Sequence, residues 1–123
     1  MNENEKTIIE FITAWSRLDP CELAGYFADD GIYHNIPLAP VAGKKEIESF
    51  IKSFTSNWIE TNWDILNIIS KDNIVIAERL DRTKMEGEKS VDLPGIGVFE
   101  LKNGEIKIWR DYFDLGTYLK ALE

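Results

Sequence analysis

The spacing of apolar residues changes near Asn57, and this change limits the folds that the chain can adopt. Before Asn57, apolar residues recur every three or four positions, which is typical of amphipathic helices. After Asn57, Ile, Val and aromatic residues gather in extended runs separated by turn residues. Helices grouped early and strands grouped late predict an α+β domain.

The first part of the chain is predicted to contain three helices and one short strand. Asp19-Pro20 is typical of a helix start, since Asp is a good N-cap and Pro is favoured at the first helical position. The helix that follows is expected to bury Leu23, Tyr26 and Phe27. The predicted elements are a helix over Glu5–Leu18, a short helix from Pro20 to about Asp30-Gly31, a strand over Ile32–Ile36 and a helix from about Gly43 that carries Ile47, Phe50, Ile51 and Phe54 on one stripe.

The second part is predicted to form a meander of hairpins. The Asn103-Gly104 pair between two apolar runs is a strong hairpin signal. The expected strands are Trp58–Ile69, Asn73–Met85, Ser90–Leu101 and Glu105–Leu115. We therefore expect a curved, mostly antiparallel sheet with the three N-terminal helices packed on its concave face, enclosing a cavity.

Composition excludes several classes of protein. A chain of 123 residues is too short for a TIM barrel and predicts one domain over residues 1–123. A net charge of -8 argues against a nucleic-acid partner. One cysteine and one histidine make a His/Cys metal site implausible. No apolar run approaches a membrane span and no secretion signal opens the sequence, so we expect a cytoplasmic protein without membrane contact.

Alternation along the strands predicts which polar side chains share a face. In the last strand, Asp111 falls on the same side as Trp109 and Phe113. In the second long strand, Arg79, Asp81 and Thr83 share a side. In the early strand Tyr33 and Asn35 share a face, whereas His34, the only histidine, falls on the opposite one and is expected to be structural.

Three segments in this order and spacing resemble the limonene-1,2-epoxide hydrolase family. They are Tyr33-His34-Asn35-Ile36-Pro37-Leu38, Glu78-Arg79-Leu80-Asp81 and Trp109-Arg110-Asp111-Tyr112-Phe113-Asp114-Leu115, joined by the similar Ala42-Gly43 and Gly97-Val98-Phe99. The resemblance runs from about Tyr33 to Leu115 and departs in a shorter amino-terminal region, which bears on how the pocket closes and on substrate size. It implies a cone-shaped fold related to nuclear transport factor 2 and ketosteroid isomerase.

The resemblance also implies a reaction. In the family's pattern Asp81 is the general acid that protonates an epoxide oxygen, and Asp111 is the general base that activates water. Arg79 bridges the two carboxylates, and Tyr33 and Asn35 help to hold the water. No metal or organic cofactor takes part, and family members are commonly homodimers. The expected activity is the one-step addition of water to a small apolar epoxide, which gives a vicinal diol.

Five further residues are candidates for the substrate pocket. Four are aromatic side chains at spacings that also suit a core, and the fifth shares the face of Asp81: Trp15, Phe54, Trp58, Phe113 and Thr83.

Two other functions are compatible with this reading of the sequence. One is an isomerase or cyclase like ketosteroid isomerase, in which one Asp moves a proton beside a carbonyl. Arg79 argues against it, because a fixed cation lowers the pKa of a neighbouring base. The other is a non-catalytic module that binds a ligand or dimerises.

Overall fold

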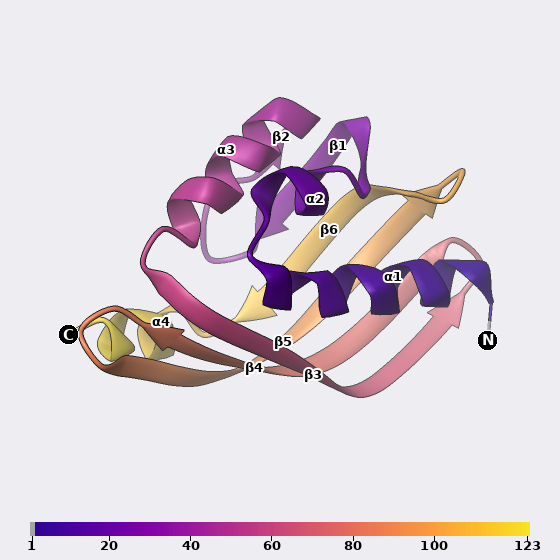
Figure 1. Ribbon diagram of the computed structural model, residues 1–123. Helices are drawn as coiled ribbons and strands as arrows, with labels where there is room; N and C mark the ends of the chain where they lie inside the picture. The colour runs from indigo at the N-terminus through magenta and orange to yellow at the C-terminus, as the bar shows by residue number, and fades with distance from the viewer. Residues whose placement is uncertain (1) are drawn as a thin grey trace.

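The computed structural model of the protein describes residues 2–123 as helices packed on one face of a curved sheet (Figure 1). The helices are α1 (Glu3–Ala14), the short 3₁₀ helix η1 (Trp15–Arg17), α2 (Pro20–Ala24), α3 (Lys44–Phe54) and α4 (Leu115–Ala121). The strands are β1 (Phe27–Asn35), β2 (Val41–Ala42), β3 (Trp58–Lys71), β4 (Ile74–Met85), β5 (Lys89–Lys102) and β6 (Glu105–Phe113). The predicted α+β class is confirmed.

The sheet has the strand order β2-β1-β6-β5-β4-β3. β3 to β6 form the predicted antiparallel meander, and the Asn103-Gly104 turn has positive φ at both residues, as a two-residue hairpin of this type requires. β1 pairs with β6 in parallel and with β2 antiparallel. The early strand is thus inserted beside the last one, and this brings the two halves of the chain together.

Two predicted boundaries on either side of Phe27 are wrong. The second helix ends at Ala24 instead of near Asp30-Gly31, and Phe27 instead begins β1, where it is fully buried opposite Ile106 of β6. Pairing with β6 gives this aromatic side chain a buried position that one more turn of helix does not offer. The expected strand Ile32–Ile36 is therefore longer, and it starts before an irregularity in its pairing with β6.

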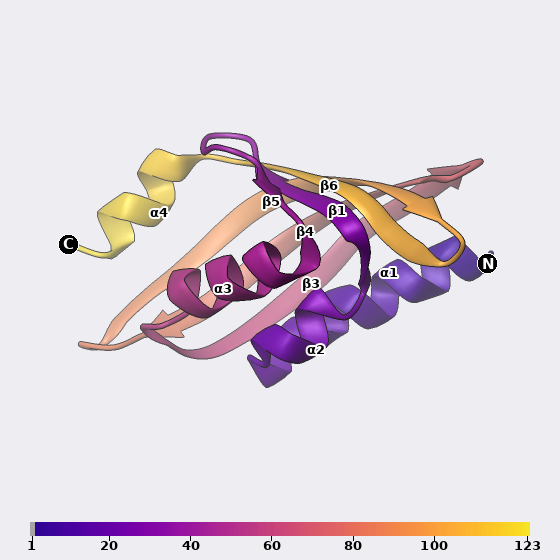
Figure 2. The ribbon, with the colours of Figure 1, turned by 90° about the horizontal axis from the view of Figure 1, so that it is seen from above.

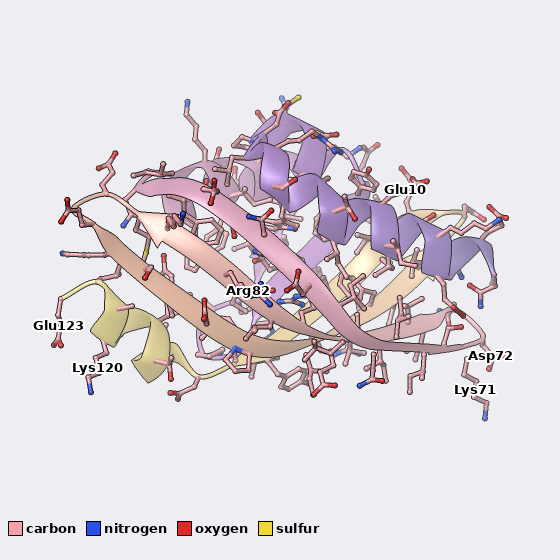
Figure 3. All side chains as sticks on the ribbon, turned by 60° about the horizontal axis from the view of Figure 1, so that its bottom comes forward. Glu10, Lys71, Asp72, Arg82, Lys120 and Glu123 are labelled. Atoms are coloured by element: carbon pink, nitrogen blue, oxygen red, sulfur yellow. The ribbon has the colours of Figure 1, made fainter. Side chains whose placement is uncertain are left out.

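A fourth helix, α4, follows the last strand, which the sequence predicts to run on to Leu115. β6 stops at Phe113, and the Asp114 side chain accepts a hydrogen bond from the backbone N–H of Thr117, which caps the new helix. α4 lies at the end of the sheet that also carries the β4–β5 turn, opposite Lys71 and Asp72 at the β3–β4 turn (Figures 1 and 3). No helix within residues 2–123 is long and apolar enough to cross a membrane.

α1, α2 and α3 lie along the inner face of the sheet (Figure 2), and the core residues pack between these helices and that face. Phe11 of α1 lies at its centre and meets Trp109 of β6 edge to face, with ring centroids 5.1 Å apart. It makes similar contacts with Phe27 of β1 and Phe99 of β5. α3 adds the buried side chains Ile47 and Ile51. These contacts hold α1 against β1, β5 and β6, the strands that surround the site described below.

Replacing Phe11 with Ala should lower the free energy of unfolding by about 3–5 kcal/mol, because the change leaves a cavity among aromatic rings that cannot close it. Urea denaturation followed by circular dichroism measures the loss. Thr13→Ala on the exposed side of the same helix is the matched control and should change stability by about 0.5 kcal/mol or less. Equal losses in the two variants would contradict the central position of Phe11.

Candidate active site

Arg79 of β4 lies between two carboxylates and is 1% exposed. It donates from Nε and Nη2 to the two oxygens of Asp81 at 3.0 and 2.9 Å. It also donates from Nη1 and Nη2 to the two oxygens of Asp111 at 2.8 and 3.0 Å. One guanidinium thus makes bidentate hydrogen bonds to both carboxylates, and this geometry fixes all three side chains.

Two glycines of β5 make room for this guanidinium. β5 runs between β4 and β6, and Gly95 and Gly97 lie where the arginine crosses it. A Cβ atom on Gly97 would lie 3.0 Å from Arg79 Nη1 and 2.8 Å from Trp109 Nε1. A Cβ atom on Gly95 would lie 3.3 Å from Arg79 Nη2. The absence of side chains at these two positions leaves room for Arg79 to reach from β4 to β6.

The cluster combines one cation with two buried acids, so it is electrically neutral when it holds one proton. Burial raises the pKa of Asp81 to about 6, and the attraction of Arg79 offsets part of that rise. Burial also disfavours the charged form of Arg79, but Asp111 and Asp81 outweigh this and hold its pKa above the usual value. Arg79 therefore stays charged, and Asp81 keeps its proton up to about pH 6.

Tyr33 and Asn35 approach this cluster from β1. The parallel pairing of β1 with β6 sets Tyr33 opposite Trp109 and Asn35 opposite Asp111. The Tyr33 ring stacks on Trp109 with centroids 4.3 Å apart, and burial raises the pKa of its phenol, which keeps it a neutral donor. Asn35 Nδ2 is buried without a hydrogen-bond partner among residues 2–123. This amide is therefore free to bind a small molecule such as water.

His34 lies between these two residues but points elsewhere. Its Nε2 donates a hydrogen bond to the carbonyl oxygen of Leu38 at 3.0 Å, which ties down the loop after β1. The side chain is absent from the pocket lining.

A pocket with an empty volume of about 410 Å³, including its open mouth, lies over the cluster. The predicted site residues line it, with the exception of Arg79, which lies buried between the acids. Thirteen residues form the wall: Trp15, Tyr33, Asn35, Phe54, Trp58, Trp63, Asp81, Thr83, Val91, Leu93, Asp111, Phe113 and Tyr118. The wall is thus mostly aromatic and aliphatic, and its carboxylates are those that Arg79 binds.

Four wall residues were not predicted. Val91 and Leu93 pair with Thr83 and Asp81 across the β4–β5 hairpin. The residues Glu86-Gly87-Glu88 between the two predicted strands are typical of a turn, and a hairpin there would have indicated these partners. Tyr118 lies on the unpredicted α4, and its hydroxyl accepts a hydrogen bond from Trp58 Nε1 at 2.9 Å.

The fourth unpredicted residue, Trp63 of β3, packs directly against the cluster. The Arg79 guanidinium lies 4.6 Å from the centre of the Trp63 ring, and the Trp15 ring stacks on the same indole with centroids 4.3 Å apart. A cation above an indole face is stabilised by the ring's charge distribution. Strand alternation marked the side to which Trp63 points, but its contact with Arg79 depends on the pairing of β3 with β4.

Comparison with known proteins finds relatives along most of the chain. The sequence model of the limonene-1,2-epoxide hydrolase catalytic domain matches residues 2–123. Epoxide hydrolase EphG of Mycobacterium tuberculosis is 27% identical over 112 residues, which are 91% of this chain and 74% of EphG. The structure of a limonene-epoxide-hydrolase-like enzyme from M. tuberculosis is similar, with a TM-score of 0.82, 26% identity and coverage of 98% of this chain and 89% of that one.

The same fold also occurs in proteins of other activities. A putative SnoaL-like polyketide cyclase from Shewanella putrefaciens has a TM-score of 0.87 with 17% identity, over 99% of this chain and 97% of that one. Likeness at this level of identity concerns the fold alone. The sequence match over residues 2–123 distinguishes one family from the others that share this fold. By this match the chain belongs to the limonene-1,2-epoxide hydrolase family.

Proposed function

We propose that the protein is an epoxide hydrolase that adds water to a small, largely apolar epoxide in one step and gives a vicinal diol. The observation that carries the proposal is the buried Arg79 that binds both Asp81 and Asp111 beside an apolar pocket. Family membership and the 27% identity to epoxide hydrolase EphG support it.

In the proposed reaction, Asp81 acts as the general acid. Its pKa, raised to about 6, lets it hold a proton at mildly acidic pH, and it donates this proton to the epoxide oxygen as the carbon–oxygen bond breaks. Asp111 acts as the general base and takes a proton from the water that attacks the ring carbon. The diol thus receives one proton from Asp81 and one hydroxyl group from water. A proton then passes from Asp111 back to Asp81, which restores the starting state.

Three other residues support this proton transfer. Arg79 keeps the two carboxyl groups in place throughout. The buried Asn35 amide and the neutral Tyr33 phenol hold the attacking water near Asp111. The reaction uses no metal or organic cofactor. Holding the water close to its base adds to the rate, because the reacting groups no longer have to meet by diffusion.

An isomerase or cyclase of the ketosteroid isomerase type is the alternative. It requires one carboxylate that works as a base beside a carbonyl compound. Arg79 already donates two hydrogen bonds to each acid, which weakens either of them as a base for carbon acids. A panel of epoxides and enones assayed side by side distinguishes the two reactions.

We also propose that two copies associate through the outer face of the sheet. This face exposes Ile96 of β5 and Tyr112 of β6 in the middle of the sheet, and Leu66 on the edge strand β3. The ion pairs Asp64–Arg82 and Glu100–Arg110 supply both signs of charge around them. An apolar centre with mixed charges suits a symmetric contact, in which the same surface meets itself.

Replacing Asp81 or Asp111 with Asn should lower kcat/KM for a hydrolysed epoxide by about 10³-fold, since each change removes a proton donor or acceptor. Formation of diol by wild type and variants measures the effect. Asp92→Asn, an exposed carboxylate of β5, is the matched control and should retain activity. A D81N/D111N double variant with wild-type turnover would refute the proposal.

The pH dependence follows from Asp81. Since its pKa is about 6 and the reaction needs its protonated form, kcat/KM should fall roughly tenfold per pH unit well above pH 6. Initial rates between pH 5 and 9 measure this limb. A rate that rises from pH 6 to pH 8 would show that Asp81 does not act as the acid.

The association proposal predicts a dimer in solution. Light scattering coupled to gel filtration should give twice the chain mass of 14.1 kDa for the wild type. Ile96→Lys should shift the protein to the monomer, because it puts a charge at the centre of the contact. Ile59→Lys, at an exposed apolar residue near the start of β3, tests whether any added lysine has this effect. A monomeric wild type would exclude the dimer.

A further inference from the structure

One stretch of the pocket wall is polar although its neighbours are apolar. Thr83 of β4 lines the pocket and is 4% exposed, and its cross-strand partners are Val91 on β5 and Thr61 on β3. The wall around it is formed by Val91, Leu93, Phe54 and the aromatic pair Trp58 and Tyr118. A valine at this position would match that wall and would have nearly the same shape.

The Thr83 hydroxyl is held by a short chain of hydrogen bonds. Trp63 Nε1 donates to Thr61 Oγ1 at 2.9 Å, and the hydroxyls of Thr61 and Thr83 lie 2.8 Å apart. Thr61 is 1% exposed, so water does not compete for the hydrogen bonds that it makes with Trp63 and Thr83. The indole N–H is a donor only, which fixes the direction of the first bond.

Counting the hydroxyl protons shows that the Thr83 hydroxyl can make one more hydrogen bond. Because Thr61 Oγ1 accepts from Trp63, its own proton goes either to Thr83 Oγ1 at 2.8 Å or to the carbonyl oxygen of Arg82 at 3.3 Å. In the first case Thr83 has a free proton to donate. In the second case Thr83 donates to Thr61 and has free lone pairs. Either arrangement leaves Thr83 able to bond with a ligand hydroxyl, which both donates and accepts.

The position of Thr83 sets the kind of ligand. It follows Asp81 by two residues on the same face of β4, so their Cα atoms are about 7 Å apart. A ligand whose epoxide oxygen meets Asp81 and whose chain lies along β4 reaches Thr83. We infer that Thr83, oriented by Thr61 and Trp63, is a specificity residue for epoxides that carry a second oxygen at the end remote from the ring. This inference rests on the proposed epoxide hydrolase function.

A matched pair of substrates tests the inference. In 5,6-epoxyhexan-1-ol a hydroxyl takes the place of the terminal methyl of 1,2-epoxyheptane, and the chain between ring and hydroxyl spans a distance similar to that between Asp81 and Thr83. The measured quantity is the ratio of kcat/KM for the alcohol to kcat/KM for the hydrocarbon. Thr83→Val should lower this ratio about three- to tenfold, the effect of one neutral hydrogen bond.

Two further variants separate recognition from packing. Thr83→Ser keeps the hydroxyl and should preserve the wild-type ratio, whereas Thr83→Val keeps the shape and should lose it. Thr13→Val, at an exposed position of α1, should leave the ratio unchanged. A ratio that is the same in wild type, Thr83→Val and Thr83→Ser would overturn the inference.

A binding measurement keeps this test independent of turnover. Quenching of the pocket tryptophans Trp15, Trp58 and Trp63 reports binding of hexane-1,2,6-triol and heptane-1,2-diol, the hydration products of the two epoxides. The triol-to-diol affinity ratio should fall about three- to tenfold in Thr83→Val. If neither epoxide is hydrolysed, the proposed function fails, and this ratio still shows whether Thr83 recognises a remote hydroxyl. An unchanged affinity ratio would overturn it.

Discussion

The fold is arranged around a single buried interaction, the guanidinium of Arg79 between the carboxylates of Asp81 and Asp111. Removing three charged groups from water is costly, and a buried ion pair is often no more stabilising than a well-packed apolar substitute. The surroundings reduce this cost: two glycines of β5 let the arginine pass, and Trp63 covers its face. A cluster so fully satisfied holds its carboxyl groups in one geometry, which is what proton transfer to a bound substrate requires.

Trp109 connects this cluster with the rest of the core. Its ring stacks on Tyr33 of β1 and on Phe99 of β5, and Phe11 of α1 meets it edge to face. The residue lies two positions before Asp111 on the same face of β6. The same side chains therefore pack the helices against the sheet and place the catalytic candidates. A substitution in this part of the core is expected to disturb the site as well.

Much of the sheet was predictable because hairpins are local. Turn residues and alternation located β3, β4, β5 and β6 within about two residues of their ends, and they set Arg79, Asp81 and Asp111 on faces that turned out to be buried. The predicted end of α2 was wrong and α4 was missed, because both helices are short. A helix of five or seven residues depends on its neighbours more than on its own residues.

The sequence by itself determined which side of each strand a residue occupies and, through three motifs, the family to which the chain belongs. The tertiary structure decided which strands are neighbours. The parallel pairing of β1 with β6 brings Asn35 beside Asp111 across most of the chain's length, and the pairing of β3 with β4 brings Trp63 over Arg79. A period of two residues carries no information about such pairings, because they depend on how all the buried surfaces pack together.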